Sequence, residues 1–203
     1  MYNFDQVINR KNTNSVKYDG DKMQDPQMIP MWVADMDFKT APAVTERLQK
    51  VVEHGIYGYS DSKEDYFAAV SGWYHDHFDW DVKPEWLVKT PGVVFALAAA
   101  VRAYTEKGDT VLIQQPVYYP FRNKILATRR CVVESPLCIT DGVYTIDFAD
   151  LEEKLAADEV KGMILCSPHN PVGRVWSKEE LQQVLILRIS MENGSSVMKF
   201  TVI

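Results

Sequence analysis

An asparagine between two prolines is the residue of this sequence best placed to take part in chemistry. Residues 167–173 read Ser-Pro-His-Asn-Pro-Val-Gly, so Pro168 and Pro171 lie on either side of Asn170. Each proline disfavours helical geometry in the residue before it, which stiffens the loop that carries the amide. A stiff loop can hold an amide still for a ligand, but a proline-rich turn with a structural Asn would have the same sequence.

The residues around this loop indicate its place in the fold. The apolar residues 162–165 predict a short buried strand before it. Ser177 as N-cap and Glu180 three residues later form the capping-box pattern of a helix start after it. The loop therefore joins a strand to a helix, and such loops bind the ligands of open α/β sheets.

A second turn has the composition of an anion site. Residues 86–89 predict a short strand, and Thr90, a possible N-cap, leads through Pro91 and Gly92 into an apolar helix over residues 93–105. A helix N-terminus presents free N–H groups and a partial positive charge, so it can bind a phosphate without a lysine. Many buried helices of α/β proteins start in this way, so the pattern alone is weak.

Strands and helices alternate along the chain. Apolar spacing predicts helices over residues 41–54, ended by Gly55 as C-cap, and over residues 64–78 and 147–157. Buried strands are predicted over residues 110–113 and 131–134, and residues 142–146 as a loop or short extended piece. The alternation predicts an α/β fold: a mostly parallel sheet with helices on both faces.

Bulk properties exclude several classes of protein. The 203 residues suffice for one core, and a net charge of −6 without a Lys/Arg cluster argues against a nucleic-acid or anionic-membrane partner. No apolar run is long enough for a membrane span, and the N-terminus has no signal-peptide pattern. Three cysteines without metal spacing fit reduced thiols, so we expect a cytoplasmic protein without a metal site.

Several motifs together resemble one enzyme family. The Asn-Pro-x-Gly loop is similar to that of the fold-type I pyridoxal phosphate (PLP) enzymes, the aminotransferase class I/II superfamily. The flanking sequence resembles the MalY/PatB branch, the cystathionine β-lyase-like C–S lyases. The motifs that carry this resemblance are residues 30–38, 54–59, 90–94, 115–121 and 167–173.

The resemblance implies which residues bind PLP. Asn170 would bond the phenolic oxygen of the cofactor, and Tyr118 would stack on its pyridine ring. The backbone of Gly92, Val93 and Val94 would hold its phosphate. Without the resemblance, Tyr118 could equally be an aromatic that caps the core.

Four further residues are implied by the resemblance from the N-terminal part of the chain. A tyrosine there reaches across a dimer interface to the phosphate of the neighbouring subunit's cofactor. We expect Tyr59 in that role, with Tyr57 as the next candidate. Ala34 and Asp35 are expected in the substrate pocket. Packed edge aromatics would explain the two tyrosines equally well.

The resemblance divides the chain into three parts. Residues 1–40 are expected to be an arm or small-domain segment, and residues 41–185 an incomplete PLP-binding large domain. Residues 186–203 resemble no part of the family and suggest a frameshifted, misjoined or truncated gene product. We expect no further family strand there, no Asp for the pyridine nitrogen and no Lys that bonds the cofactor. Lys199 follows a faint Ser-x-x-Lys pattern that we attribute to chance.

Three functions remain open. The resemblance favours a homodimeric, β-eliminating C–S lyase that acts on cystathionine or cysteine S-conjugates and yields a thiol, pyruvate and ammonia. A class I/II aminotransferase shares the same scaffold. A non-catalytic fragment, at most a dimer-interface partner, is the third, because this chain lacks the catalytic lysine and would hold PLP only non-covalently.

Overall fold

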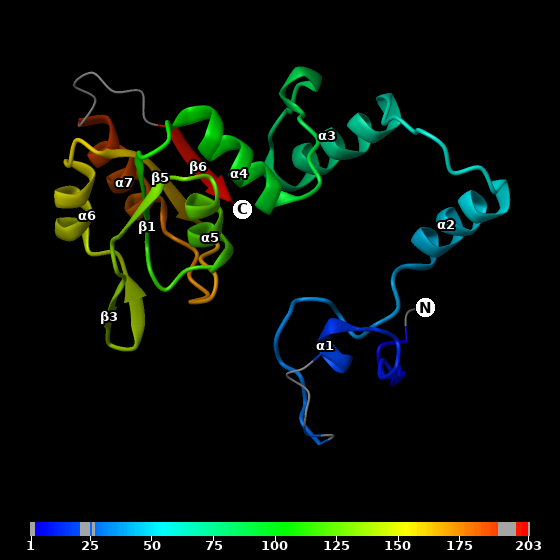
Figure 1. The fold of residues 1–203 in the computed structure, drawn as a ribbon. Coiled ribbons are helices and arrows are strands. Elements are labelled where there is room, and N and C mark those ends of the chain that lie inside the picture. The colour runs from blue at the N-terminus through cyan, green and yellow to red at the C-terminus, as the bar shows by residue number, and fades with distance from the viewer. Residues whose placement is uncertain (1–2, 21–24, 26, 191–197, 203) are drawn as a thin grey trace. The chain divides into compact units, whose positions relative to one another are not determined.

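The computed structural model describes residues 3–20, 25, 27–190 and 198–202, with side chains through Leu187. The chain divides into two compact units, residues 1–68 and 69–203 (Figure 1). Each unit has its own architecture and is described by itself.

A parallel sheet organises the second unit. It consists of β1 (Thr110–Ile113), β2 (Cys131–Glu134), β5 (Val160–Cys166) and β6 (Met198–Val202) in the order β2-β1-β5-β6. The predicted strands over residues 110–113 and 131–134 are confirmed. The chain leaves β1 toward β2 on one side and returns to β5 on the other. This reversal makes the carboxyl ends of β1 and β5 a topological switch point, where open α/β sheets bind ligands.

Helices cover both faces of the sheet, as predicted (Figure 1). On one face, Leu97 of α4 (Val93–Tyr104) and Phe121 of α5 (Pro120–Ala127) pack in one buried cluster with Ile113. On the other, Leu151 of α6 (Phe148–Leu155) and Val184 of α7 (Lys178–Ser190) pack in a second cluster with Leu112. Successive β1 side chains thus enter opposite cores, as expected of a strand buried on both faces.

The structure overturns one local prediction and adds elements at two other places. The predicted strand over residues 86–89 is absent. Instead Pro84–Trp86 is a 3-10 turn, in which the N–H of Leu87 donates to the carbonyl of Pro84 at 3.1 Å. The helix α5 was not predicted, although Pro120 in its first turn and the apolar pair Phe121 and Ile125 fit a helix. Residues 138–145 form a two-stranded hairpin of β3 (Cys138–Thr140) and β4 (Val143–Thr145).

The expectation that no further strand follows residue 185 is also corrected. Helix α7 runs without a break to Ser190, and β6 pairs in parallel with β5. Parallel pairing needs a crossover connection, and α7 provides it. Ser196 lies outside the described residues, and only the backbone of Lys199 is described. The predicted division at residue 185 stays a prediction.

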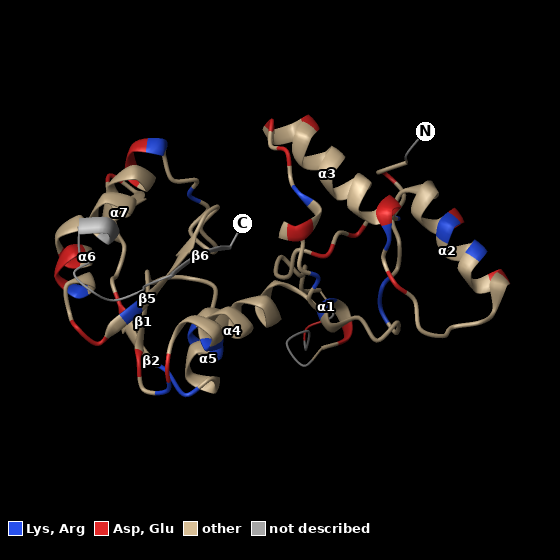
Figure 2. Ribbon diagram, turned by 90° about the horizontal axis from the view of Figure 1, so that it is seen from above, with Lys and Arg blue, Asp and Glu red and all other residues tan. Residues whose placement is uncertain are grey.

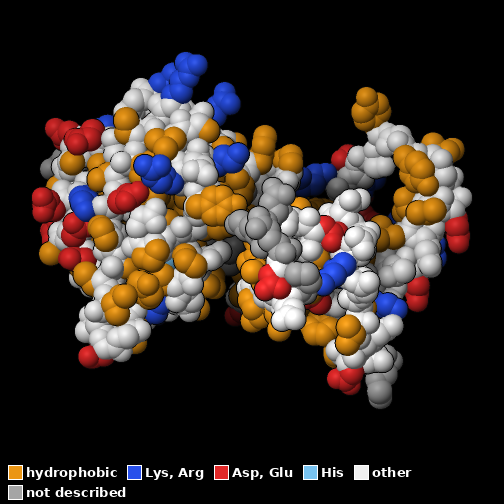
Figure 3. Space-filling view, turned by 60° about the horizontal axis from the view of Figure 1, so that its bottom comes forward, with side chains coloured by type: hydrophobic (Ala, Val, Ile, Leu, Met, Phe, Trp, Pro, Cys, Tyr) orange, Lys and Arg blue, Asp and Glu red, His pale blue; other side chains and the backbone are white. Residues whose placement is uncertain are grey.

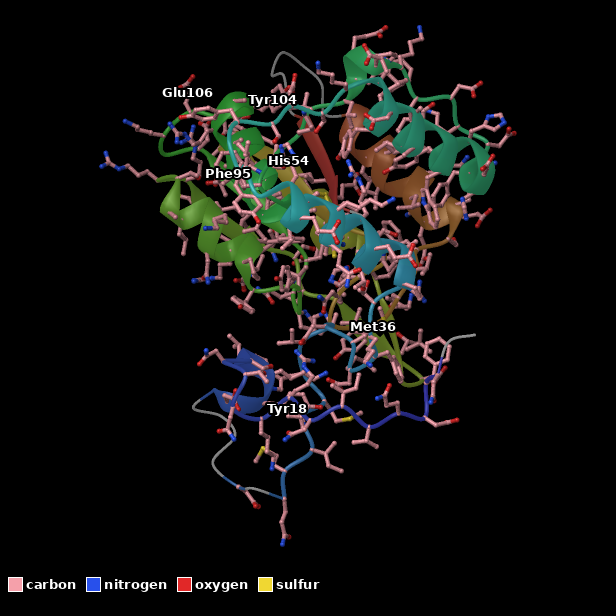
Figure 4. The ribbon with its side chains drawn as sticks, turned by 90° about the vertical axis from the view of Figure 1, so that its right-hand side faces the viewer. Tyr18, Met36, His54, Phe95, Tyr104 and Glu106 are labelled. Atoms are coloured by element: carbon pink, nitrogen blue, oxygen red, sulfur yellow. The ribbon has the colours of Figure 1, made fainter. Side chains whose placement is uncertain are left out.

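Ion pairs connect separate segments of the first unit. Its helices are α1 (Val16–Asp19) and α2 (Pro42–His54), and α3 (Glu64–Phe78) crosses the boundary to the second unit. Arg10 pairs with Asp35 and Asp37, and Lys17 pairs with Asp37 at 3.2 Å. Arg10 also lies over the ring of Tyr18, and it donates to the carbonyl of Met36 at 3.4 Å. Figure 4 labels Tyr18 and Met36.

Charge and apolar area are spread over the surface. Acidic and basic residues are interspersed along α2 (Figure 2). No described residue of α2 is buried, and its predicted apolar stripe, for example Leu48 and Val52, is exposed among many surface apolar groups (Figure 3). The predicted C-cap is confirmed, because Gly55 has φ 71° and its N–H donates to the carbonyl of Val51.

Candidate functional site

A pocket of about 470 Å³ lies where the predicted cofactor residues of the second unit meet. It opens at the carboxyl ends of β1 and β5, beside the N-terminus of α4. Its walls come from three loops that are far apart in the sequence. The lining residues are Pro91, Gly92, Val93, Val94, Phe95, Leu97, Tyr118, Phe121, Cys166, Pro168 and Asn170. Five of the seven residues predicted to bind the cofactor are among them.

The first turn of α4 forms the wall with free donors. Gly92 is the N-cap, with φ 134° and ψ 164°, a conformation that is essentially restricted to glycine. Its carbonyl accepts the N–H groups of Phe95 and Ala96, each at 3.1 Å. Within the described residues, the N–H groups of Val93 and Val94 have no acceptor. These two amides and the helix dipole make the turn attractive to an anion.

The capping prediction for this helix is wrong in detail. Thr90 was a possible N-cap, but its hydroxyl donates to the carbonyl of Gly92 at 3.2 Å and accepts no helical N–H. A Cβ built on Gly92 would have no atom within 4 Å, so the space in front of the turn is open. The amides of the first turn therefore face a volume that a ligand group can fill.

Tyr118 and Asn170 belong to the loops that leave β1 and β5. The Tyr118 ring contacts Phe121 edge-on, with ring centroids 5.9 Å apart, and is 37% exposed. Phe121 is anchored in the core at 2% exposure. The buried ring thus supports the exposed one, and leaves a face of Tyr118 accessible at the pocket. Asn170 is exposed and contributes an amide that can donate and accept.

The structure adds Cys166 to the pocket, which the sequence analysis did not predict. Cys166 is the last residue of β5 and is 4% exposed. Its Sγ donates to the carbonyl of Pro168 at 3.3 Å. Burial raises the pKa of the Cys166 thiol, so it stays protonated at neutral pH.

Hydrogen bonds between residues near its two ends close the loop that carries Asn170. The capping box is confirmed: the N–H of Glu180 donates to Ser177 Oγ at 3.2 Å, and the N–H of Ser177 donates to Glu180 Oε2 at 2.7 Å. The indole N–H of Trp176 donates to the carbonyl of Cys166 at 2.8 Å, which ties the end of the loop back to β5. The start of α7 and the end of β5 thus limit how the loop can move.

The other four predicted residues belong to the first unit. Tyr59 is fully exposed, and the hydroxyl of Tyr57 donates to the carbonyl of Val52 at 3.1 Å. Ala34 is exposed, and the carboxylate of Asp35 is engaged by Arg10. Their predicted roles stay predictions.

The polar groups of the pocket suit a particular ligand chemistry. None of the described residues that line it is charged, so a bound anion would rest on backbone amides and on the dipole of α4. Tyr118 offers an aromatic face and Asn170 a hydrogen-bonding amide. A flat aromatic ring that carries a phosphate group matches these groups.

Among the described residues, no three His, Cys, Asp or Glu side chains are grouped so as to hold a metal ion. None of the described helices combines the length and apolar character that crossing a bilayer requires.

Comparison with known proteins places this pocket in context. The family model described as aminotransferase class I and II matches residues 26–194. The chain is 44% identical over 197 residues to cystathionine beta-lyase PatB of Bacillus subtilis (strain 168), covering 96% of this chain and 50% of that protein. It therefore spans about half the length of that relative.

Solved structures give the same result. Cystalysin from Treponema denticola, whose crystal structure contains pyridoxal 5'-phosphate, superposes with a TM-score of 0.88 at 39% identity, covering 99% of this chain and 51% of that one. The PLP-bound C–S lyase from Staphylococcus hominis superposes with a TM-score of 0.87 at 33% identity, covering 98% of this chain and 50% of that one.

Proposed function

Because the chain belongs to the aminotransferase class I and II family, we propose that its pocket is the PLP site of a β-eliminating C–S lyase. The observation that supports this most directly is the meeting of five predicted cofactor residues in one pocket at the sheet's switch point. The similarity to a cystathionine beta-lyase and to a PLP-bound C–S lyase supports the same choice.

The residues of the pocket fit the cofactor. In the proposal, the amides of Val93 and Val94 bind its phosphate, and the open space in front of Gly92 admits that group. Tyr118 stacks on the ring, an interaction of about 1 kcal/mol beyond area burial. Asn170 bonds the phenolic oxygen and fixes the rotation of the ring in its plane. When bound, PLP supplies an electron sink for charge that develops at the substrate Cα.

Substrate and partner complete the proposal. Cystathionine or a cysteine S-conjugate is the proposed substrate of the lyase lineage, with thiol, pyruvate and ammonia as products. Tyr59, or else Tyr57, is proposed to reach the phosphate of a second subunit's cofactor, and Ala34 and Asp35 to line the substrate pocket. A homodimer and a cytoplasmic location belong to the same proposal.

The 203-residue chain itself is proposed to bind PLP reversibly and not to turn over. Among the described residues that line the pocket there is no lysine, so none of these residues offers a covalent anchor or a base for the Cα proton. The test is a titration of the purified chain with PLP, followed by borohydride reduction, mass spectrometry and a pyruvate assay with cystathionine. We expect saturable binding, no cofactor bonded to any lysine and no pyruvate.

Each result of this test is decisive. The absence of saturable binding would refute the PLP site. Pyruvate formation by the pure chain, or cofactor trapped on Lys199, would refute the inactive state. An aminotransferase is the alternative function, and a keto acid formed only in the presence of an amino-group acceptor would favour it over the lyase.

The coding DNA offers an independent test of the tail. A shifted reading frame that starts at the third base of the Val197 codon contains the Glu codon GAA. The last base of the Met198 codon, ATG, and the first two bases of the Lys199 codon form it, whichever of the two lysine codons is used. The codon before that Glu is Asp when the Val197 codon ends in G. We expect the Val197 codon to end in G. We also expect the shifted frame to continue without a stop codon as far as a lysine codon. A stop codon directly downstream in this frame would contradict a frameshift at the tail.

A further inference from the structure

His169 connects the two loops that carry Tyr118 and Asn170. Its side chain is 1% exposed, and its Nε2 lies 3.0 Å from the carbonyl oxygen of Pro116. Pro116 is two residues before Tyr118, and Asn170 follows His169 directly. One buried imidazole therefore bridges the loop that leaves β1 and the loop that leaves β5.

The backbone of His169 also closes the turn that presents Asn170. Its N–H donates to the carbonyl of Arg174 at 2.6 Å, and its carbonyl accepts the N–H of Gly173 at 2.8 Å. The ring packs edge-on against Trp176, with centroids 5.4 Å apart. The residue is thus fixed at its backbone, at its ring face and at Nε2, and Asn170 is the adjacent residue in the chain.

The hydrogen bond determines the tautomer of the ring. A carbonyl oxygen only accepts, so Nε2 must carry the proton and Nδ1 must hold a lone pair. Burial lowers the pKa of His169. The carbonyls of Pro116, Gln114 and Cys166 raise it by less than burial lowers it, so the ring is neutral at pH 7.

The buried imidazole carries a cost that an apolar ring would avoid. Among the described residues Nδ1 is buried and has no hydrogen-bond partner. A buried polar atom without a partner is unfavourable and calls for an explanation. A phenylalanine could fill the same space beside Trp176 without that cost. What the imidazole adds is the N–H donated to Pro116.

We propose that His169 is a positioning residue that sets the Tyr118 loop against the Asn170 loop across the pocket. It touches neither cofactor nor substrate and acts through the carbonyl of Pro116. This inference rests on the proposed function for its effect on PLP. Its effect on the two loops does not depend on PLP and is measurable without it.

Three variants of the full chain test the proposal. His169→Gln retains an N–H donor near the position of Nε2, whereas His169→Phe retains a ring and loses the donor. Thr128→Val is the matched control, because it removes a side-chain donor to a backbone carbonyl, that of Ile125, and Thr128 does not line the pocket. Thermal melts identify any variant that does not fold, and His169→Gln keeps the test open if His169→Phe is one of these.

The first readout is amide hydrogen exchange over residues 117–121 without PLP. We expect His169→Phe to speed exchange there about tenfold, the value of one net hydrogen bond, and His169→Gln to stay within about threefold of the parent chain. Thr128→Val should leave exchange in this segment unchanged. Equal exchange in His169→Phe and the parent chain, or in His169→Phe and His169→Gln, would overturn the proposal.

The second readout is the PLP dissociation constant. We expect it to rise about tenfold in His169→Phe and to recover in His169→Gln to within about threefold of the parent value. Unchanged affinity in His169→Phe would overturn the positioning role. If the parent chain binds no PLP, the proposed function fails, and the exchange readout alone decides the role of His169.

Discussion

In the second unit the side chains of β1 are buried on both faces, whereas in the first unit Lys17 is the only buried residue among those described. Apolar burial dominates the stability of a folded domain, while exposed ion pairs contribute little and are screened by salt. The two units therefore hold their predicted site residues with different precision. The pocket residues of the second unit rest on a core, and Ala34 and Asp35 rest on a surface ion-pair network.

This difference teaches which parts of the proposed site are preorganised. The amides of α4, Tyr118 and Asn170 are brought together by packing that lies beneath them. The segment around Asp35 is held by Arg10, which is itself partly exposed. Changes to the second unit should therefore alter stability and PLP binding, while changes to the first should remain local.

The largest effect is expected for the core beneath the pocket. Phe121→Ala should lower the free energy of unfolding by about 3–5 kcal/mol, because it leaves a cavity under Tyr118. Phe38→Ala, at a ring that is 49% exposed in the first unit, should cost less than about 1 kcal/mol. Urea unfolding measures both values. Similar costs would remove the contrast between the units.

The next effect concerns backbone conformation. Gly92→Ala should cost about 1–3 kcal/mol, because φ 134° with ψ 164° strains any residue with a Cβ, and it should also weaken PLP binding. Gly58→Ala is the control in the first unit, where a Cβ meets no atom within 4 Å and φ is not in the strained range. Titration and unfolding of both variants measure the difference. If Gly92→Ala changed neither the free energy of unfolding nor PLP binding, the first turn of α4 would tolerate other backbone geometries.

A smaller effect is expected at the helix caps. Ser177→Ala should destabilise the chain by about 1 kcal/mol, because it removes the hydroxyl that accepts the N–H of Glu180. Ser15 is also an N-cap, but its side chain makes no capping bond, so Ser15→Ala should cost less. Denaturant midpoints measure both. A larger cost for Ser15→Ala would mean that the first unit depends on its caps as well.

Acid should affect the second unit through His169. Because its folded pKa is lowered, the unfolded chain takes up the proton more readily, so stability is present above about pH 6.5 and declines as the pH falls below it. His169→Gln lacks this titration and should show a shallower decline between pH 7.5 and 5 in chemical unfolding. Burial raises the pKa of the Cys166 thiol, so it stays protonated over this range. Parallel curves for the two chains would contradict the prediction.

The smallest effect is expected in the first unit. Arg10→Ala should increase proteolysis within residues 31–38 and leave global unfolding unchanged, because the lost ion pairs are partly exposed. Arg47→Ala, an exposed arginine of α2, is the control. The hydrogen bond from Arg10, more than that from Lys17, lowers the pKa of Asp37, so the network should persist down to acid pH and fail as the pH falls through that lowered value. A change in the global midpoint would refute this local role.

Some of the site could be predicted because its signals are local. The capping box of Ser177 and Glu180 and the period of the apolar residues in α3 depend on neighbours within a few positions. The buried strand over residues 110–113 is marked by an unbroken apolar run between turns. The sequence motifs that resemble the family also lie in continuous segments, so they predicted roles for Asn170 and Tyr118, and both residues line the pocket.

Local signals failed where a neighbour far along the chain decided the outcome. Residues 86–89 have a composition that suits a strand, yet they join no sheet, and the 3-10 turn at Pro84 takes up the N–H of Leu87. Helix α5 was missed because its short apolar pattern directly follows the aromatic residues of the preceding loop. Cys166 was not assigned to the pocket because its neighbours there come from α4 and α5.

The amino-acid sequence by itself determined the family, the α/β class and the chemical groups available for a phosphate and a flat ring. Only the tertiary structure decided that β1 lies between β2 and β5, that their carboxyl ends open into one pocket, and that His169 turns away from it toward Pro116. The physical reason is that helix periods and caps are set over a few residues. Strand order and loop contacts, in contrast, follow from burying both faces of the sheet at once.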